Sequence, residues 1–395
     1  MKKNIFLLGL MAIALTAASC SGDNNEENIN TPEDNTMPEG TADVTINETD
    51  ANYADYATNW CNYAAAVSSR LKDDAATLYK AWNEGLNGEE AYKTTFKEAK
   101  GAYRSPNNCI EQIIDGCIDI ANEVGESKIG DPRDKWENGK YTEAVYAVES
   151  WYSYHSIQDY SNNIRSIQNA FNCTYKGRQG SHSIAAYLIA NGQTELASQV
   201  NSRINAAITA IEGMAAPFRS HIGNPSVLTA MEACNNLKDI LKTLKAKVES
   251  FEGEAELKAI VADYVDVVVL PTYKDLKEAN AALHLAVQNL AANPSNATFE
   301  TAAMAWMAAR SPWEMSEAFL FGPVDELGLD PNMDSWPLDQ DAIKNVLASG
   351  DFSGLDWSGD FDEENEGIAE AQSIRGFHTL EFLLFKNGEP RKIES

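Results

Sequence analysis

The sequence predicts an all-α protein made of two packed helical-bundle domains, with a long acidic loop in the C-terminal one. Apolar residues recur at helical spacing over long stretches, as in residues 51–86 and 226–251, and this periodicity indicates amphipathic helices. Strand signals are few, because alternation never persists and no Asn-Gly pair is flanked by β-branched runs. The chain has 395 residues, of which 44% are hydrophobic, and this length suits two domains.

Residues 1–19 have the pattern of a secretory signal peptide. Two lysines precede an apolar stretch at residues 5–15 and a run of small residues. The apolar stretch is shorter than the roughly 20 residues that a spanning helix needs. The run Ala17-Ala18-Ser19-Cys20 has the form of a bacterial lipobox, which predicts a lipid on Cys20; ordinary cleavage beside an incidental cysteine is the alternative. We therefore expect a protein anchored by lipid to the bacterial outer membrane, on its periplasmic or cell-surface side.

Residues 20–50 are predicted to form the lipid anchor and a disordered acidic tether. Between residues 21 and 50 there are nine acidic residues and no basic ones. A segment of this composition cannot bury enough apolar surface to become ordered. It is expected to connect the anchored cysteine to the helical part of the chain.

The first helical bundle is predicted to span residues 51–252. Its longer helices are expected at residues 51–86, 110–124, 142–171, 183–190, 195–218 and 226–251. The second of these should end at Gly125, and residues 128–139 should be irregular because they contain Gly130, Pro132 and Gly139. The helix at residues 142–171 is unusual, since it carries polar side chains where core residues are expected.

The second helical bundle is predicted to span residues 253–395. A long helix is expected over residues 254–292, kinked at Pro271, and the next helix should begin at Thr298. Residues 322–367 are rich in Asp, Gly, Pro and Trp and predict a long connection. Within it, residues 351–362 read as an acidic, solvated loop.

Charge and cysteine content exclude some classes of function. The chain carries 59 acidic residues against 31 Lys and Arg, a formal charge of −28. This argues against nucleic acid as a partner, because nucleic-acid binding requires Lys and Arg to neutralise phosphates. Five cysteines follow Cys20 and no CxxC motif occurs, so neither a zinc ribbon nor a redox motif is indicated. Disulfide pairing cannot be read from the spacing.

The apolar stretch at residues 373–385 contains one imidazole and one carboxylate at helical spacing. A helix places residues i and i+3 on one face, so His378 and Glu381 should point the same way from a segment too apolar to lie in water. Buried polar groups need partners. Two interpretations stay open: the two side chains satisfy each other and a nearby arginine, or they bind a transition-metal ion with ligands from other segments.

The run Arg375-Gly376-Phe377-His378-Thr379-Leu380-Glu381 resembles the GxHxxE signature of the imelysin-like family. Further landmarks of that family are Leu270-Pro-Thr-Tyr, Trp306-Met-Ala-Ala-Arg310-Ser-Pro-Trp, Ser316-Glu317, Ser335-Trp-Pro-Leu and, in the other half, Val124-Gly-Glu-Ser-Lys-Ile-Gly-Asp-Pro. In most members the signature half comes first, whereas here it comes last. The resemblance therefore also suggests a circular permutation, which is feasible because chain termini usually lie close together at the surface.

The resemblance implies an extracytoplasmic lipoprotein that binds iron or another divalent metal at the interface of the two bundles and acts in iron uptake. The expected metal ligands are His378, Glu381 and Glu317. The expected supporting residues of the cleft are Gly376, Arg375, Arg310, Ser153, Asp159 and Asn163. The arginines would orient carboxylates through bidentate contacts, and the glycine would allow close helix approach. An outer-membrane receptor or uptake component is the expected partner.

The resemblance leaves other functions open, because some members of the family are described as peptidases. The alternatives are a metallopeptidase of the imelysin type and a surface lipoprotein that binds a sugar, a peptide or a partner protein. The sequence has no HExxH motif, which supplies two zinc ligands and a general base in most metallopeptidases. It also lacks a GxSxG nucleophile elbow. We therefore predict a binding protein and assign no catalytic residue.

Overall fold

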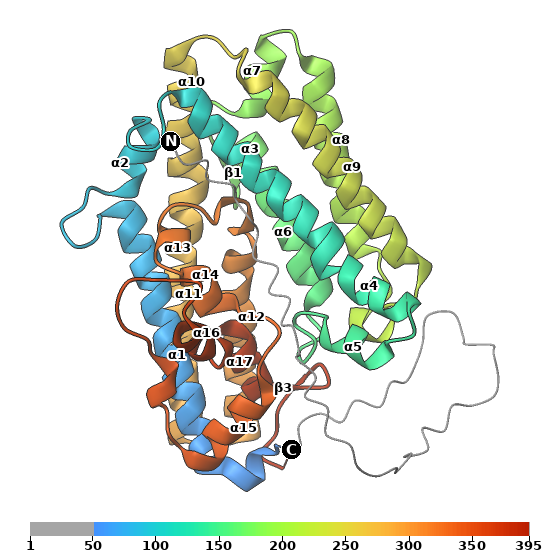
Figure 1. Ribbon diagram of the computed structural model, residues 1–395, viewed down its shortest axis with the longest axis vertical. Coiled ribbons are helices and arrows are strands. Elements are labelled where there is room, and N and C mark those ends of the chain that lie inside the picture. The colour runs from blue at the N-terminus through green and yellow to red at the C-terminus, as the bar shows by residue number, and fades with distance from the viewer. Residues whose placement is uncertain (1–50, 395) are drawn as a thin grey trace. The chain divides into compact units, whose positions relative to one another are not determined.

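The long helix α1 (Tyr53–Asn83) follows the apolar periodicity of the sequence. Trp60, Val67 and Leu71 lie on one stripe of this helix and are buried, as expected for a helix that packs on one side. In the computed structural model, which describes residues 51–394, α1 runs beside α11 (Leu270–Ala292) (Figure 1). Helix α11 in turn packs on α12 (Asn296–Glu314). These helices form the first of two helix groups.

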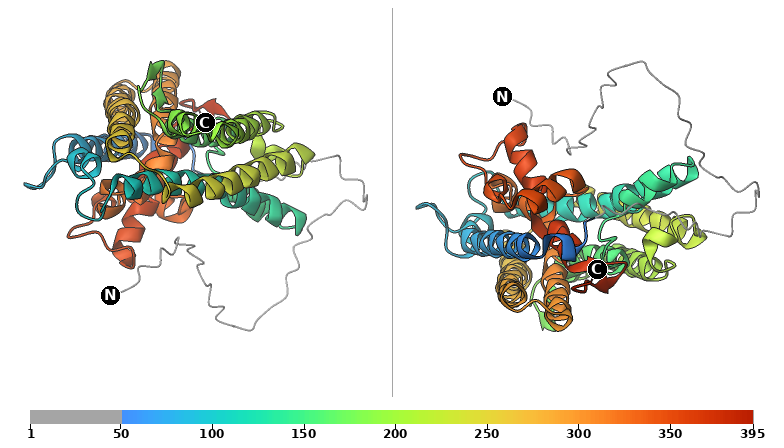
Figure 2. Two further views of the ribbon diagram at one scale, coloured as in Figure 1. Left: turned by 90° about the horizontal axis from the view of Figure 1, so that it is seen from above. Right: turned by 90° about the horizontal axis from the view of Figure 1, so that it is seen from below.

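The second helix group packs around α9 (Pro225–Val248). Both α3 (Pro106–Asn122) and α8 (Thr194–Glu212) lie against α9. Helix α6 (Ser156–Asn172) lies against α8 and α3 (Figure 1), and Figure 2 shows the helices from above and from below. The two groups meet where α6 contacts α12 and where α3 contacts the 3₁₀ turn η4 (Glu317–Phe319). We call this contact region the seam.

The predicted all-α fold is confirmed. Two short antiparallel hairpins are described, β1 (Thr174–Tyr175) with β2 (Arg178–Gln179) and β3 (Phe385–Lys386) with β4 (Glu389–Pro390). The remaining elements are α2 (Tyr92–Lys97), η1 (Glu123–Lys128), α4 (Gly130–Glu137), α5 (Tyr141–Tyr146), α7 (Ile184–Ala190), η2 (Phe218–Ser220), α10 (Glu254–Asp263), η3 (Tyr264–Val269), α13 (Pro323–Glu326), α14 (Leu329–Asp334), α15 (Gln340–Ser349), η5 (Ser353–Leu355), α16 (Glu366–Ser373) and α17 (Gly376–Leu384).

Capping residues set where several helices begin. The Ser105 hydroxyl accepts a hydrogen bond from the Asn108 N–H at the start of α3, and the next residue is a proline, which suits a first helical position. Ser295 and Thr298 form a capping box at the start of α12. This helix therefore begins two residues before the predicted start, because Thr298 is its third residue and not its first.

The prediction of one helix over residues 142–171 is wrong. Helix α5 ends at Tyr146 and α6 begins at Ser156, and residues 147–155 between them are irregular. Within this segment Ser150 and Tyr154 have φ angles of 50° and 61°, in the left-handed region that does not continue a right-handed helix. The backbone N–H groups here are consequently available to side chains of other elements.

The connection predicted over residues 322–367 is shorter than expected. Helices α13, α14 and α15 occupy most of residues 322–350, and the irregular part is residues 351–365 around η5. Most of residues 351–362 are exposed, as expected for an acidic loop. Residues 128–139 are also more ordered than predicted, because they contain α4.

Two π-helices stand where the sequence predicts interruptions. The segment η3 precedes α11, and Pro271 lies in the first turn of α11, where a missing N–H is tolerated. The segment η1 continues α3 through Gly125, the residue predicted to end that helix. Such π-turns insert a residue into a helix and are often found at functional sites.

One continuous cluster of buried apolar side chains runs through both helix groups. Helix α1 precedes the predicted boundary at residues 252–253, yet it packs on α11, α15 and α17 from the C-terminal part. The boundary and the circular permutation stay predictions.

The predicted signal peptide, Cys20 and the acidic tether lie outside the described residues. Within residues 51–394 no helix is long and apolar enough to span a membrane. The five cysteines of this range are buried and unpaired.

Candidate functional site

His378 and Glu381 lie one turn apart on α17, and both are fully buried. The Nδ1 atom of His378 lies 3.1 Å from Oε2 of Glu381. The other oxygen, Oε1, accepts hydrogen bonds from the backbone N–H of Ser153 at 2.8 Å and from its hydroxyl at 2.7 Å. The irregular segment 147–155 thus reaches α17 and fixes the Glu381 carboxylate.

The second nitrogen of His378, Nε2, lies 3.2 Å from Oδ1 of Asp334 at the end of α14. Burial and the Arg310 charge act to lower the pKa of His378, but Asp334 and Glu381 outweigh them and raise it to about 9. Both imidazole nitrogens of His378 thus face carboxylate oxygens. The structure therefore gives His378, predicted as a metal ligand, two carboxylate partners.

Arg310 of α12 connects both helix groups through three carboxylates. Its Nε lies 3.4 Å from Oδ2 of Asp159, its Nη2 lies 2.6 Å from Oε1 of Glu314, and its Nη1 pairs with Asp334. The Arg310 side chain is fully buried, and these partners come from α6, α12 and α14. We define the Arg310 side of the site as Arg310, Asp159, Asp334, His378 and Glu381.

The other predicted supporting residues have different positions. Arg375 pairs with Asp74 of α1 at 2.5 Å and donates to the Leu355 carbonyl at 3.0 Å, so it does not join the Arg310 side. Gly376 has a φ of +87°, and a Cβ there would lie 2.5 Å from the carbonyl oxygen of Met333. This glycine lets α17 begin directly against the end of α14, which brings His378 to Asp334.

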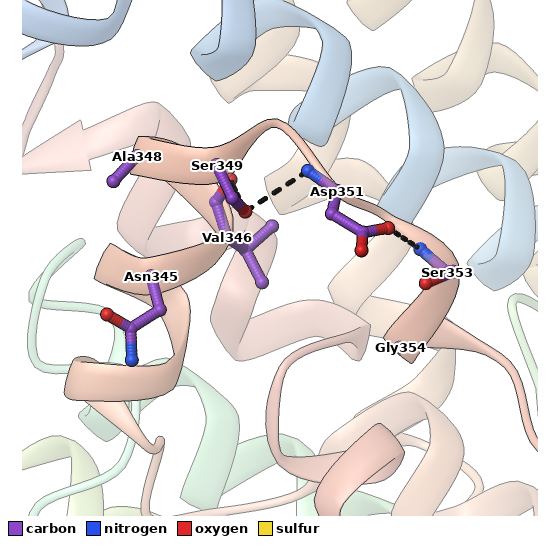
Figure 3. Close-up of a pocket in the computed structure, with 7 residues that line it drawn as sticks. All are labelled: Asn345, Val346, Ala348, Ser349, Asp351, Ser353 and Gly354. Atoms are coloured by element: carbon purple, nitrogen blue, oxygen red, sulfur yellow. Dashed lines mark hydrogen bonds between the residues drawn. The ribbon is translucent and has the colours of Figure 1, made fainter.

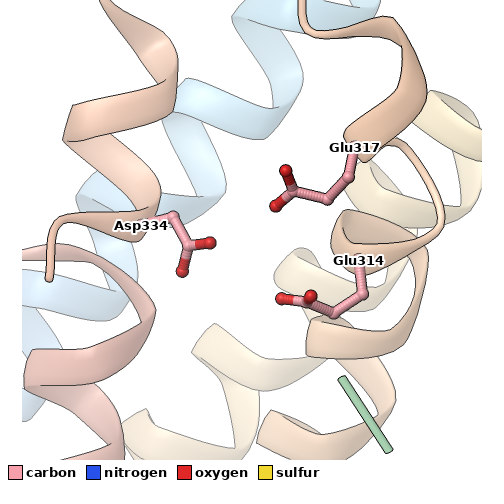
Figure 4. Close-up of side chains that lie close together, drawn as sticks. All are labelled: Glu314, Glu317 and Asp334. Carbon is pink, nitrogen blue, oxygen red and sulfur yellow. The ribbon is translucent and has the colours of Figure 1, made fainter. Parts of the chain in front are cut away.

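Three carboxylates converge at the seam. Oxygen atoms of Glu314 at the end of α12, Glu317 on η4 and Asp334 at the end of α14 lie within 4.8 Å of one another (Figure 4). Carboxylate oxygens are the ligands of hard and borderline divalent cations. Of the predicted metal ligands, Glu317 belongs to this carboxylate cluster, whereas His378 and Glu381 lie outside it.

The three carboxylates of the cluster differ in their electrostatics. Burial raises the pKa of Glu314 to about 8, although Arg310 acts to lower it. Burial also raises the pKa of Glu317 well above its usual range, with Lys128 opposing this effect and Glu314 adding to it. Burial acts in the same direction on Asp334, but Arg310 and His378 hold the pKa of Asp334 far below its usual range. The cluster thus contains one firmly ionised carboxylate and two that lack sufficient positive charge.

Two observations indicate that the carboxylate cluster suits a divalent cation. The Glu317 carboxylate is only 7% exposed and has no hydrogen bond or ion pair with any residue in the range 51–394. The Oδ1 atoms of Asp159 and Asn163 are also buried without a described hydrogen-bond partner. Buried acids without partners are unfavourable, and a cation would offset this cost. Glu314, Glu317 and Asp334 would hold the ion, and His378 would orient Asp334 from behind.

Lys128 supplies a further positive charge that acts on Glu317. Its Nζ lies 3.0 Å from Oε2 of Glu149 and 3.6 Å from Oε1 of Glu123, and its side chain is only 4% exposed. It is the last residue of η1. We define the Lys128 side of the site as Lys128, Glu123, Glu149 and Glu317.

The sequence analysis did not identify Glu314, Asp334 or Lys128 as site residues. Each adjoins or lies within a family landmark: Glu314 follows Trp313, Asp334 precedes Ser335, and Lys128 is inside the run that begins at Val124. The signal that could have found them is therefore their place beside these motifs. The remaining predicted residue, Asn163, donates to Oε2 of Glu314 at 2.5 Å.

A surface depression at residues 345–354, between α15 and η5, lies apart from these residues (Figure 3). Its polar groups are engaged with each other, because the Asp351 N–H donates to the Ser349 hydroxyl and the Ser353 N–H donates to the Asp351 carboxylate. None of the predicted site residues lines it. We therefore place the candidate site at the seam.

Comparisons with known proteins show which proteins this chain resembles. The sequence profile of the imelysin family, peptidase M75, matches residues 35–244 and 269–394. The crystal structure of an imelysin peptidase from Bacteroides ovatus aligns with a TM-score of 0.84 and 50% sequence identity, covering 87% of this chain and 99% of that chain. Iron-regulated protein A of Synechococcus elongatus is 35% identical over 130 residues, which are 33% of this chain and 32% of that protein. The match thus spans about a third of that relative's length.

Proposed function

Because the chain belongs to the imelysin family, we propose that it is an extracytoplasmic lipoprotein that binds iron or another divalent metal at the carboxylate cluster for uptake. The observation that carries this proposal is the Glu317 carboxylate, which is buried beside Glu314 and Asp334 without a hydrogen bond or ion pair in the described chain. The similarity to a protein named iron-regulated protein A supports the link to iron.

The surroundings of the cluster are suited to holding carboxylates in fixed positions. The Trp313 indole N–H donates to Oδ2 of Asp334 at 2.7 Å, and Asn163 donates to Glu314. Outer hydrogen bonds of this kind orient ligating side chains and increase metal affinity. A bound divalent ion would supply the positive charge that the cluster lacks, and Glu317 is the ligand least restrained before binding.

The proposed location rests on the sequence pattern at the N-terminus. A lipid on Cys20 would hold the chain at the outer membrane, and the acidic segment of residues 20–50 would give the helical part reach toward a receptor or uptake component. The acidic residues of the tether would also attract cations and raise their local concentration near the helical part.

Titration of metal-free protein with Fe²⁺ under anaerobic conditions, and separately with Mn²⁺, tests the metal proposal by calorimetry. We expect one ion per chain, and we expect Glu317→Gln to weaken the affinity by about tenfold or more, because it replaces a charged ligand with a neutral one of the same shape. Glu300→Gln is the matched control, since Glu300 is an exposed acid on α12 that does not belong to the carboxylate cluster. Absence of binding by the wild type, or an unchanged affinity in Glu317→Gln, would overturn the proposal.

A peptidase function is the second candidate, because the Bacteroides ovatus protein is named an imelysin peptidase. The structure offers little support for it: His378 and Glu381 are fully buried, so a polypeptide cannot contact them in this conformation. We expect no cleavage of an unfolded polypeptide substrate, with or without added metal. Chelator-sensitive cleavage that is lost in His378→Ala would instead establish the enzyme.

A further inference from the structure

The site approaches solvent on its Lys128 side. His378, Glu381, Arg310 and Glu314 are fully buried. By contrast, the side chains of Lys128, Glu149 and Glu123 are 4%, 13% and 38% exposed. The two acids that pair with Lys128 are thus more exposed than Lys128 itself, and Glu123 is the most exposed of the three.

The backbone that carries Lys128 is held close to its neighbours by two glycines. A Cβ at Gly125 would lie 2.9 Å from Cβ of Cys234 on α9, and a Cβ at Gly130 would lie 2.9 Å from the Gly125 carbonyl oxygen. Gly125 of η1 and Gly130 at the start of α4 thus leave no room for a side chain at either position. The backbone around Lys128 is closely packed, whereas a lysine carries its ammonium on a flexible four-carbon stem.

The Lys128 ammonium interacts with two sets of acids. It is within ion-pair distance of Glu149 and Glu123. Its charge also acts on Glu317 and Glu314 of the carboxylate cluster, and no hydrogen bond joins it to either of them in the described part of the chain. The charge of Lys128 therefore acts on the cluster without being tied to it.

We propose that Lys128 is a tethered cation that competes with the incoming metal ion and so determines which cations the site accepts. This inference rests on the proposed metal function. Two positive charges close to the same acids repel each other, so an ion that binds weakly to carboxylates cannot displace the ammonium. An ion that binds strongly does so, and the ammonium then moves outward to Glu123, its more exposed partner.

The test is a Mn²⁺ titration of the full chain, followed by the electron paramagnetic resonance signal of free Mn²⁺. Lys128→Met keeps the apolar stem and removes the charge, and we expect it to bind Mn²⁺ about tenfold tighter or more than the wild type. Lys128→Arg keeps the charge and should bind like the wild type. Lys238→Met is the matched control, because Lys238 pairs at 3.7 Å with Glu126 of η1 and hydrogen-bonds Asn122 and Asn235, outside the site.

Thermal unfolding with and without Mn²⁺ gives a second readout. Without metal, Lys128→Met should melt below the wild type, because its acids have lost their counter-charge. Mn²⁺ should raise the melting temperature of Lys128→Met more than that of the wild type, or refold it if it is unfolded without metal. A lysine that is only structural predicts weaker binding and no additional rescue by metal.

The outcomes separate the two proposals. If the wild type binds Mn²⁺ and Lys128→Met binds it equally or more weakly, the role of Lys128 is overturned and the metal function stands. If neither protein binds Mn²⁺ or Fe²⁺, the metal function itself is overturned.

Discussion

The Arg310 side and the Lys128 side of the seam contain similar numbers of charged groups but differ in how completely these groups are paired. On the Arg310 side, the guanidinium contacts three carboxylates, and His378 bonds two. On the Lys128 side, the ammonium contacts Glu149 and Glu123, and Glu317 has no hydrogen bond among the described residues. From this difference we infer that the Arg310 side holds the two helix groups together at the seam. The Lys128 side, by contrast, contains a buried acid whose charge is not balanced by a direct partner. Three predictions test this contrast.

The largest effect should come from removing the central cation of the Arg310 side. Arg310→Met leaves Asp159, Glu314 and Asp334 buried without their counter-charge, and breaking such a group costs about 3–5 kcal/mol. The free energy of unfolding in urea measures this loss. Arg70→Met is the control, because Arg70 pairs with the 58%-exposed side chain of Asp356 and should cost less than about 1 kcal/mol. Equal losses in the two variants would mean that the Arg310 side does not hold the two helix groups together.

The next effect concerns pH. Asp334 and Glu381 raise the pKa of His378 from 6.5 to about 9, so the folded state binds this proton more tightly than the unfolded state. The resulting stabilisation, on the order of 3 kcal/mol, should be fully present below pH 6.5 and be lost as the pH rises through 9. Melting temperatures of the wild type and His378→Gln in chelator should therefore differ most below pH 6.5 and converge above pH 9. A difference that grows with rising pH would show that the imidazole is neutral.

The smallest effect should have the opposite sign and lie on the Lys128 side. Glu317→Gln removes an acid without a partner, so we expect the metal-free protein to gain about 1 kcal/mol of stability. Glu381→Gln provides the contrast, since Glu381 accepts two hydrogen bonds from Ser153 and its change should cost about 1–3 kcal/mol. Chemical denaturation in chelator measures both. If both variants lose stability equally, the two sides are equivalent.

The helical periodicity of the sequence predicted the all-α class and most long helices, because apolar stripes such as that of α1 report directly on burial. Local pattern did not predict the break at residues 147–155, since its stabilising contact is Glu381, more than two hundred residues away. The predicted pair His378 and Glu381 is indeed close in space. Glu314 and Glu317 lie three residues apart, so local spacing could have brought them together. The place of Asp334 beside them could not be predicted from spacing, because α14 must pack near the end of α12 before these residues meet.

The surroundings of His378 illustrate the same limit. Spacing on a helix predicted that its imidazole points inward, and it does. Spacing carried no information about Asp334, which contacts the second nitrogen from α14. Whether a buried histidine serves as a ligand or as a hydrogen-bond donor depends on such partners, and these are set by tertiary packing.

Helix α17 is buried at every residue from Gly376 to Leu384, and it packs against α1, α12 and α14. It follows α1, α12 and α14 in the sequence, so these three helices are synthesised before it. The helices that surround α17 are therefore made before the helix that they bury. Their apolar faces toward α17 stay exposed until α17 has been synthesised. Apolar surface that is exposed in this way makes a partly folded chain prone to aggregate until α17 has been synthesised.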